Sequence, residues 1–414
     1  MQISSKRLWS VLATFAVALC ALVVAAPALP KSSANTTIVI WTDHDRNAAV
    51  TKVAGDWAST RGVTVKVVEK TFGDIRDNLK TVAAADAPDV IVGAHDWTGE
   101  LAANGLVVPL FPKKATLTQF PSYTLAAFSY GTAVKKLYGA PVAVENIGLV
   151  VNTKLAKVPT TFAQLESEAL KFKNKKKGNL AIAVQQGANG DAYHMYPFFS
   201  GLGGYIFGKN SAGNLDPSDI GVANKVFLKN ASLIDKWNKE GLINAKVDST
   251  TAQNAFLKGQ AAFWVTGPWN IDTIKKQGIQ FKVVQVPAVK QASVPFLGVQ
   301  GFMVTKYAAE HGNDAAAKDL VASYMMTPAA QQILAAANNR YPANVQAGNK
   351  VSDPYLAQFG KAAKGGVPMP NIPQMNSVWS DLGSAWVKST KGAGATKAAV
   401  AFRTAARNIA AKIG

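Results

Sequence analysis

Short apolar runs alternate with stretches of helical periodicity through the first part of the chain. The apolar, β-rich runs fall at 37–41, 63–68 and 89–92, and the helical stretches fall at 48–60 and 75–84. Strands that alternate with helices are typical of βαβ units, which place neighbouring strands parallel in one sheet. The pattern therefore predicts an α/β fold with mainly parallel sheets flanked by helices.

The same alternation resumes at Ile147 and continues to the end of the chain. The expected strands are 180–184, 261–265, 281–286 and 298–304. The expected helices are 192–201, 221–240, 250–257, 314–326, 329–338, 374–388 and 396–413. No low-complexity linker separates the two regions, so we expect two lobes between which the chain crosses several times. Lobes connected in this way can close about a ligand by a hinge motion.

Polar residues cluster where several of the expected strands end. One cluster spans 43–46, a second is His95-Asp96, and a third is Glu145-Asn146. In open α/β sheets, ligands bind outside the carboxyl ends of the strands. The coincidence of three polar clusters with strand ends predicts a binding site there.

The N-terminus has the features of an export signal. Lys6 and Arg7 precede an uncharged apolar run over 8–26, and Ala26-Pro27-Ala28 provides small residues around a cleavage point. We expect a signal peptide over 1–28, cleaved after Ala28, and hence a periplasmic or cell-surface protein. The alternative is lipidation at Cys20, but Leu19 stands before it where a small residue is expected.

Cysteine and histidine usage predicts no metal site and no cofactor. The only cysteine lies in the leader, so the mature chain has no disulfide, no cysteine-ligated metal and no cysteine nucleophile. The four histidines show no metal-ligand spacing, and they are His44, His95, His194 and His311.

The overall composition is globular but strongly basic. The chain is 48% hydrophobic and 17% charged, with a net charge of +19. Such a charge raises a nucleic-acid-binding alternative. The lysines fall in short runs, such as 171–177 and 113–114, without a recognisable nucleic-acid-binding motif. We interpret the runs as solvated surface, which in an exported protein also suits residence near anionic lipid or wall polymer.

Four segments carry a family resemblance. Two prolines within 369–375 stiffen a loop that leads into a helix bearing Trp379; taken alone, this motif could simply anchor a core tryptophan. Together with Ala94-His-Asp96, Pro141-Val-Ala-Val-Glu145 and Gly267-Pro-Trp269, it resembles the periplasmic maltose/maltodextrin-binding proteins, the solute receptors of sugar ABC importers. The resemblance runs from Val39 to about Arg407.

The resemblance implies a type II periplasmic-binding-protein fold. Its N-lobe would comprise 37–147 and 299–348, and its C-lobe 148–298 and 349–414. It further implies a receptor with two partners, a maltose/maltodextrin-type oligosaccharide and the permease subunits of an ABC importer in the membrane. We expect a monomer without a cofactor. Another glucoside, such as trehalose, stays open as the ligand.

The resemblance also assigns the site residues. Hydroxyl groups of a sugar require paired donors and acceptors, and the C–H faces of its rings require flat apolar surfaces. The expected polar contacts are Asp45, Arg46, Asp96, Glu145 and Asp191. The expected aromatic contacts are Tyr193, Trp269 and Trp379, with Trp97 as a plate peculiar to this chain. Departures from the family pattern, which leave the exact sugar open, occur at Gly93, Trp97, Ser380 and Gly383.

Three alternatives accompany this assignment. Asp45 and Asp96 could be helix N-caps, and Trp269 could fill core. Asp45, Asp96, Asp191 and Glu145 could instead serve a glycoside hydrolase, which uses two carboxylates. A structural surface protein would show no response to small ligands. The resemblance favours a binding protein that is not an enzyme.

Overall fold

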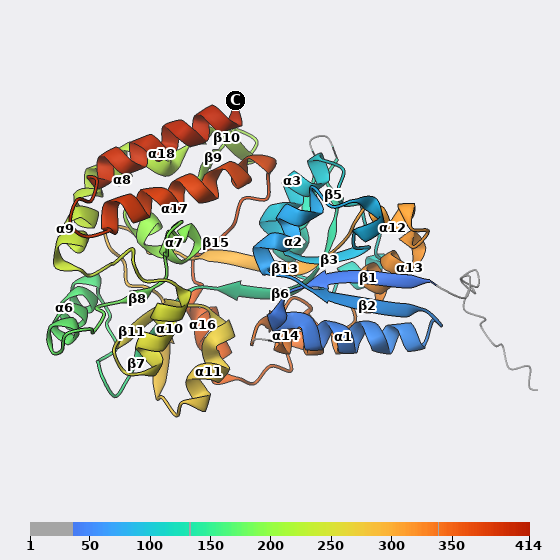
Figure 1. The fold of residues 1–414 in the computed structure, drawn as a ribbon, viewed down its shortest axis with the longest axis horizontal. Coiled ribbons are helices and arrows are strands. Elements are labelled where there is room, and N and C mark those ends of the chain that lie inside the picture. The colour runs from blue at the N-terminus through green and yellow to red at the C-terminus, as the bar shows by residue number, and fades with distance from the viewer. Residues whose placement is uncertain (1–35, 132–133, 338) are drawn as a thin grey trace, which may run out of the picture.

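Two β-sheets organise the chain into two lobes (Figure 1). The computed structural model describes residues 36–131, 134–337 and 339–414. The expected leader over 1–28, with Cys20, lies outside these residues. Within them, no helix is both long and apolar enough to span a membrane.

The first lobe is built on a seven-stranded sheet. In spatial order its strands are β14 (Tyr341–Pro342), β6 (Gly139–Asn146), β13 (Phe296–Val304), β3 (Val90–Ala94), β1 (Thr37–Thr42) and β2 (Thr64–Glu69), and β15 (Val367–Pro368) also pairs with β13. Strand β1 runs parallel to β2 and β3, whereas β13 runs antiparallel to β3 and β6.

The second lobe is built on a four-stranded sheet. Its order is β12 (Phe281–Val284), β7 (Gly148–Asn152), β11 (Phe263–Thr266) and β8 (Ala183–Val184). Strand β7 is antiparallel to both of its neighbours, and only β11 and β8 run parallel. Two small hairpins, β4–β5 (Ser129–Tyr130, Lys136–Leu137) and β9–β10 (Phe207–Lys209, Leu215–Ile220), lie outside the main sheets.

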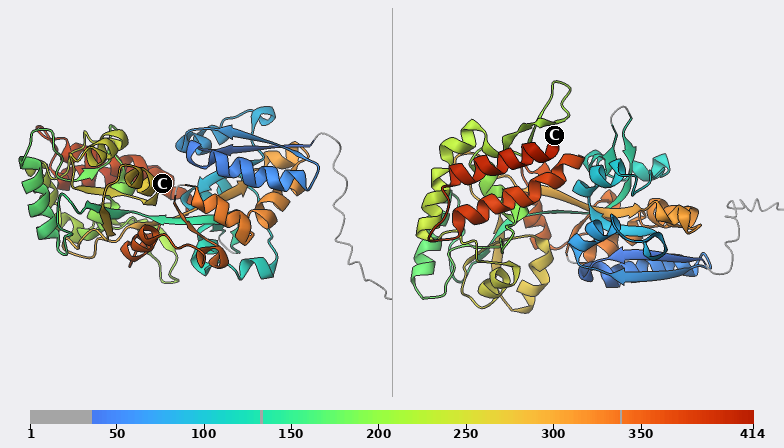
Figure 2. Two further views of the ribbon diagram at one scale, coloured as in Figure 1. Left: turned by 90° about the horizontal axis from the view of Figure 1, so that it is seen from below. Right: turned by 45° about the horizontal axis from the view of Figure 1, so that its top comes forward.

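The predicted two-lobed α/β fold is confirmed, but the expectation of mainly parallel sheets is wrong because both sheets are mixed. The reason lies in how the chain crosses between the lobes. It leaves the first lobe along β6 and returns along β13, so these two strands must run in opposite directions. Only Ile147 separates β6 from β7, and Asn146 pairs with Leu297 at the crossing. Figure 2 shows the two lobes as bodies joined by these strands.

Helices cover both sheets. Those of the first lobe are α1 (His44–Ser59), α2 (Phe72–Leu79), η1 (Ala84–Asp86), η2 (His95–Trp97), α3 (Thr98–Ala103), α4 (Lys114–Leu117), α5 (Ser122–Ala127), α12 (Tyr307–Glu310), α13 (Asp314–Asp319), the π-helix η5 (Leu320–Tyr324), α14 (Pro328–Ala336) and α15 (Val345–Gly348). Those of the second are α6 (Phe162–Asn174), α7 (Ala192–Gly201), η3 (Gly221–Ala223), α8 (Lys225–Asn230), α9 (Ser232–Glu240), α10 (Ser249–Leu257), η4 (Pro268–Asn270), α11 (Ile271–Lys276), α16 (Pro354–Ala362), η6 (Pro373–Met375), α17 (Asn376–Thr390) and α18 (Ala398–Ile413).

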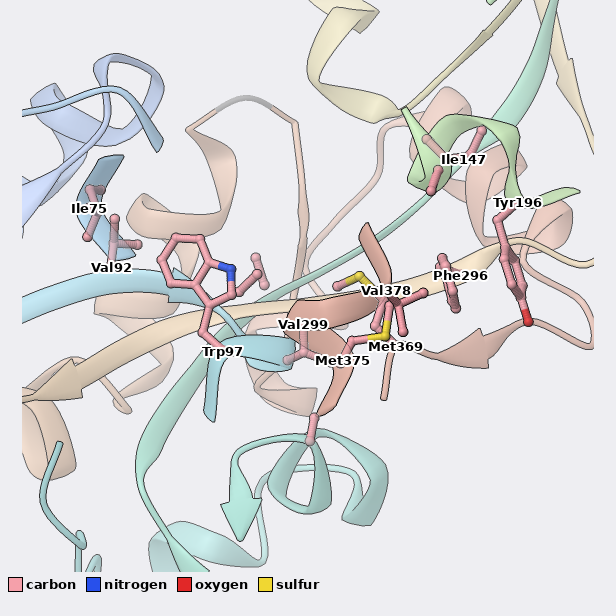
Figure 3. Close-up of a cluster of buried hydrophobic side chains, with 14 of the residues drawn as sticks. Ile75, Val92, Trp97, Ile147, Tyr196, Phe296, Val299, Met369, Met375 and Val378 are labelled. Atoms are coloured by element: carbon pink, nitrogen blue, oxygen red, sulfur yellow. The ribbon is translucent and has the colours of Figure 1, made fainter. Parts of the chain in front are cut away.

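Buried side chains continue from one lobe into the other (Figure 3). Trp97 lies against Val92 and Ile75 in the first lobe, while Met375 and Phe296 belong to the same cluster further along. The lobes are therefore in contact through apolar side chains as well as through strands. This contact positions the polar residues described next.

Candidate functional site

Seven of the nine residues expected at the site come together where the lobes meet. The first lobe supplies Arg46 from α1, Asp96 from η2 and Glu145 from β6. The second lobe supplies Asp191 at the cap of α7, Tyr193 in α7, Trp269 in η4 and Trp379 in α17.

One hydrogen bond and one close approach relate these side chains across the lobes. The indole Nε1 of Trp379 donates a hydrogen bond to Oδ2 of Asp96 at 3.1 Å. Between the lobes, a Cβ built on Gly298 would lie 2.9 Å from Cγ of Glu145 and 3.3 Å from the hydroxyl of Tyr193, so this glycine leaves room for both side chains. In both places a carboxylate of the first lobe lies near an aromatic residue of the second.

The remaining two expected residues lie at the margin or in the core. Asp45 is exposed on the first turn of α1, although its negative charge still favours the charged forms of Arg46 and Arg340. Trp97 is only 5% exposed, and its ring lies 4.7 Å from that of Phe72. The structure therefore does not bring Trp97 to the group.

The departure at Gly93 is explained by the position of Trp97. A Cβ on Gly93 would lie 2.6 Å from Cε3 of Trp97 and 2.8 Å from Cε of Met303. The glycine therefore provides the space that the indole occupies in the core.

The capping alternative does not hold for either aspartate. Asp43, not Asp45, caps α1: its carboxylate accepts from the amide of Arg46 at 3.0 Å and pairs with the guanidinium of the same residue. Asp96 forms no side-chain cap for α3, which follows it. Trp269 is half-buried rather than filling core.

Glu145 is the centre of a buried charged group. It is 7% exposed and accepts hydrogen bonds from the guanidinium of Arg340 and, at 2.8 Å, from Nε2 of Gln300. Burial raises the pKa of Glu145, but Arg340 and Arg46 outweigh this effect and hold it below its ordinary value. Burial and the nearby Arg340 lower the pKa of Arg46 to about 10. A carboxylate with two guanidinium neighbours stays charged.

Arg340 was not among the residues expected from the sequence, yet it links the lobes. Its guanidinium carbon lies 5.6 Å from the centre of the Trp269 ring, a cation–π geometry. Asn339 before it has a φ of 53°, in the left-handed region, which turns the chain after α14. Asn339, which directly follows the expected helix 329–338, is the local sequence signal for such a turn.

Asp96 differs from Glu145 because it lacks a close cation. It is 8% exposed, and burial raises its pKa to about 6 even though Arg76 and the bond from Trp379 act in the opposite direction. Its second oxygen, Oδ1, is buried and accepts no hydrogen bond. A donor from a ligand would lower this pKa and favour the charged form.

Asp191 organises the second-lobe side of the group. Its carboxylate caps α7 by accepting from the amide of His194 at 2.9 Å, and it also bonds the Nδ1 of His194 and the amide of Gln185. Burial raises its pKa, but His194 outweighs this and lowers the net value. Because Nδ1 faces a carboxylate, the neutral ring presents Nε2 as an acceptor.

Several buried polar atoms in this group have no partner. Twelve buried side-chain nitrogen or oxygen atoms lack a hydrogen bond across the described residues, and five of them gather here. They are Asp96 Oδ1, Tyr193 Oη, His194 Nε2, Gln300 Oε1 and Arg340 Nη1. A buried polar group left unpaired costs about 1–3 kcal/mol, so a ligand that bonds them is favoured. Donors and acceptors are mixed, which suits hydroxyl groups, since a hydroxyl donates once and accepts twice.

Aromatic rings border the same atoms. Tyr193, Trp269 and Trp379 are each half-buried, so part of each ring surface is open. Phe296 lies behind two of them, 6.2 Å from the Tyr193 ring and 5.8 Å from the Trp379 ring between centroids. Among residues 36–131, 134–337 and 339–414, no group of His, Cys, Asp and Glu could hold a metal ion. The arrangement can bind a polyhydroxylated ligand with flat apolar faces.

Comparison with known proteins agrees with this geometry. A family model described as bacterial extracellular solute-binding protein matches residues 51–363. This chain belongs to that family. The solute-binding family is one of binding proteins rather than enzymes, so the glycoside hydrolase alternative is not favoured.

Relatives of this solute-binding protein match over most of their length. It is 29% identical to the galactooligosaccharide-binding protein of Bacillus subtilis, covering 92% of this chain and 91% of that one. It is also 29% identical to the maltodextrin-binding protein MdxE of the same organism, covering 81% and 80%. The solved maltotriose binding protein of Thermus thermophilus, bound with maltotriose, superposes with a TM-score of 0.81 at 28% identity, covering 91% of this chain and 100% of that one.

Proposed function

We propose that this solute-binding protein captures a maltodextrin-type oligosaccharide between its lobes and delivers it to an ABC importer. The observation that carries the proposal is the group of five unpartnered polar atoms bordered by three half-buried aromatic rings. A sugar ring offers hydroxyls at its rim and C–H groups on its faces, so it matches both kinds of surface. The named ligands of two relatives, maltodextrin and maltotriose, support the α-glucan class.

Individual roles follow from the geometry. Asp96 and Glu145 would hold sugar hydroxyls from the first lobe, with Arg46 beside them and Asp45 at the margin. Asp191 would act on the second-lobe side, while Tyr193, Trp269 and Trp379 would stack on rings. Trp97, which is buried against Phe72, would not contact the sugar. The segment limits proposed from the sequence are 37–147 with 299–348 and 148–298 with 349–414. Sheet membership supports them for the strands other than β15, which lies within 349–414 but pairs with β13 of the first-lobe sheet.

A second ligand class needs to be tested beside the first. The galactooligosaccharide-binding relative matches this chain over a larger share than the maltodextrin-binding one. Trehalose also fits the hydroxyl requirement. The proposed setting is a monomer outside the cytoplasm, cleaved after Ala28 or anchored at Cys20, with permease subunits as its partners.

Calorimetric titration of the mature protein tests the proposal. The sugars are maltose, maltotriose, trehalose and a galactooligosaccharide, with overnight product analysis of each mixture. We expect the tightest binding for maltotriose and no cleavage. Asp96→Asn should weaken binding about tenfold or more, because the amide is a poorer acceptor and brings a donor to the site.

The site assignment has its own controls. Trp379→Ala should weaken binding by about 1.4–3 kcal/mol, while Asp86→Asn, which removes an exposed charge elsewhere, should leave affinity unchanged. If the galactooligosaccharide binds most tightly, the proposed ligand class is wrong but the proposed site still holds. Equal affinity of wild type and Asp96→Asn for every sugar bound would contradict the site itself.

A further inference from the structure

A hollow at the outer end of the second lobe carries several lysines. It has a volume of about 760 Å³ and is bordered by the loop 153–158, the end of α6 and the start of β12, with Tyr355 of α16 as one wall. Its lysines come from three elements, and they are Lys154, Lys157, Lys171 and Lys282. We call this hollow the lysine pocket. Its size falls within the range of about 300–1,000 Å³ that is usual for small-molecule sites.

The positive charge of the lysine pocket is not neutralised within the protein. All four lysines are exposed, and none of them forms an ion pair with any residue that the structure describes. Glu168 is the one carboxylate among the lining residues, and it is half-buried. Four like charges around one concave surface repel each other, so an anion placed among them is favoured.

The walls of the lysine pocket are formed in advance. Thr153 donates two hydrogen bonds to the carbonyl of Gln280, from its amide at 3.0 Å and its hydroxyl at 3.1 Å. The amide of Lys154 donates to the side chain of Asn152 at 3.1 Å. Tyr355 stacks on Phe281 with ring centres 3.9 Å apart and planes 11° apart. A preformed site loses less conformational entropy when it binds a ligand.

The lysine pocket is separate from the sugar site. Strands β7 and β11 pair antiparallel, with Gly148 opposite Thr266 at one end and Val151 opposite Phe263 at the other. Trp269 follows the first end, whereas the loop 153–158 follows the second. Five strand residues span about 16 Å. The two sites therefore lie at opposite ends of the second-lobe sheet, and α6 marks the outer end in Figure 1.

We propose that the lysine pocket binds a phosphate-bearing anion. Lysine ammonium groups bind phosphate as point charges, and a phosphate group offers up to two negative charges and several acceptor oxygens. The run 171–177, of which Lys171 is the first residue, adds further exposed lysines beside the pocket. The source of the phosphate is either a lipid headgroup or a soluble phosphate compound, and both share this chemistry.

Two probes test the proposal on the full mature chain. Calorimetry with tripolyphosphate measures the soluble source, and co-sedimentation with vesicles of phosphatidylglycerol, against phosphatidylcholine vesicles, measures the headgroup source. Changing all four pocket lysines to glutamine should weaken binding of the effective probe at least tenfold. A matched variant changes four exposed lysines elsewhere to glutamine (Lys66, Lys113, Lys114 and Lys391), which removes the same charge.

A single substitution should change anion affinity in the opposite direction. Glu168→Gln removes the negative charge of the lining and should tighten anion binding about two- to fivefold. Maltotriose affinity should stay unchanged in all three variants, which shows that they fold and separates this test from that of the sugar site. Failure of both probes to bind overturns the proposal. So does an equal loss in the pocket variant and the matched variant, which would assign binding to overall charge.

Discussion

Asp96 shows how a single residue makes the molecule sensitive to pH. Its pKa in the folded protein is raised to about 6, mainly by burial, against an ordinary value of 3.8. Between these two values the folded state holds more protons than the unfolded state, so this residue's contribution to stability is present at low pH and lost as pH rises through 6. The loss amounts to about 3 kcal/mol at most.

A comparison of two proteins isolates this effect. Asp96→Asn cannot titrate, so its free energy of unfolding relative to wild type should rise between pH 4 and pH 7. Chemical denaturation across this range measures the difference in the free energy of unfolding between the two proteins. Both proteins contain Glu145 and Asp191, so the effects of their lowered pKa values cancel in this difference. If the difference in the free energy of unfolding stays constant over this range, the pKa of Asp96 is not raised.

Arg340 and Glu145 form a buried pair in which each residue depends on the other. Both side chains are 7% exposed, and removal of one partner leaves a buried charge without its main counter-ion. Arg340→Met should therefore lower the free energy of unfolding by about 3 kcal/mol. The double variant with Glu145→Gln should recover most of this loss. Denaturant unfolding of wild type, Arg340→Met and the double variant measures these differences. A double variant no more stable than Arg340→Met would refute the pairing.

The sequence predicted Glu145 but not Arg340, and the reason is distance along the chain. An isolated carboxylate in an apolar strand signals a partner, because an unpaired buried charge is costly. That partner lies 195 residues away, and no local pattern specifies which of many basic residues it is. Trp97 shows the opposite failure, because the sequence predicted a ring that stacks on the sugar. A tryptophan beside a site residue can equally well pack into the core behind that residue.

At the scale of elements, caps decide where helices begin and what they present. Thr161 caps α6 with a capping box completed by Gln164, and Asp191 caps α7 while it also holds His194. Loss of either cap should cost about 0.5–2 kcal/mol of stability. Thr161→Ala should leave sugar affinity unchanged, whereas Asp191→Ala should also weaken it. Thermal unfolding and titration of the two variants measure both effects; equal affinities would remove Asp191 from the site.

Caps also explain which elements the sequence could predict. The helix expected at 192–201 has these limits in the structure, because Asp191 is the N-cap at which it begins. The single helix expected over 221–240 is instead divided into η3, α8 and α9. Asn224 accepts from the amides of Val226 and Phe227 and so begins α8 anew. Apolar periodicity runs through this point and cannot reveal the division, because it depends on a side chain that bonds locally.

At the scale of the molecule, the lobes touch through the Asp96–Trp379 hydrogen bond and the Arg340–Trp269 contact. A ligand that bonds both lobes favours this closed arrangement only through contacts that an open one lacks. Small-angle scattering of the mature protein should show a smaller radius of gyration with saturating maltotriose than without sugar. Trp379→Ala should reduce the change at equal saturation. An identical radius with and without bound sugar would argue against closure.

Strand β13 has a consequence for how the protein is made. It lies between β6 and β3, so these two strands share no neighbour until residues 296–304 have been synthesised. Pairs such as Asn146 with Leu297 join distant parts of the chain, and such contacts form slowly. A nascent chain that ends before β13 would present two open sheet edges. The strand that joins the lobes thus delays folding, because the first sheet cannot close before about three quarters of the chain has been made.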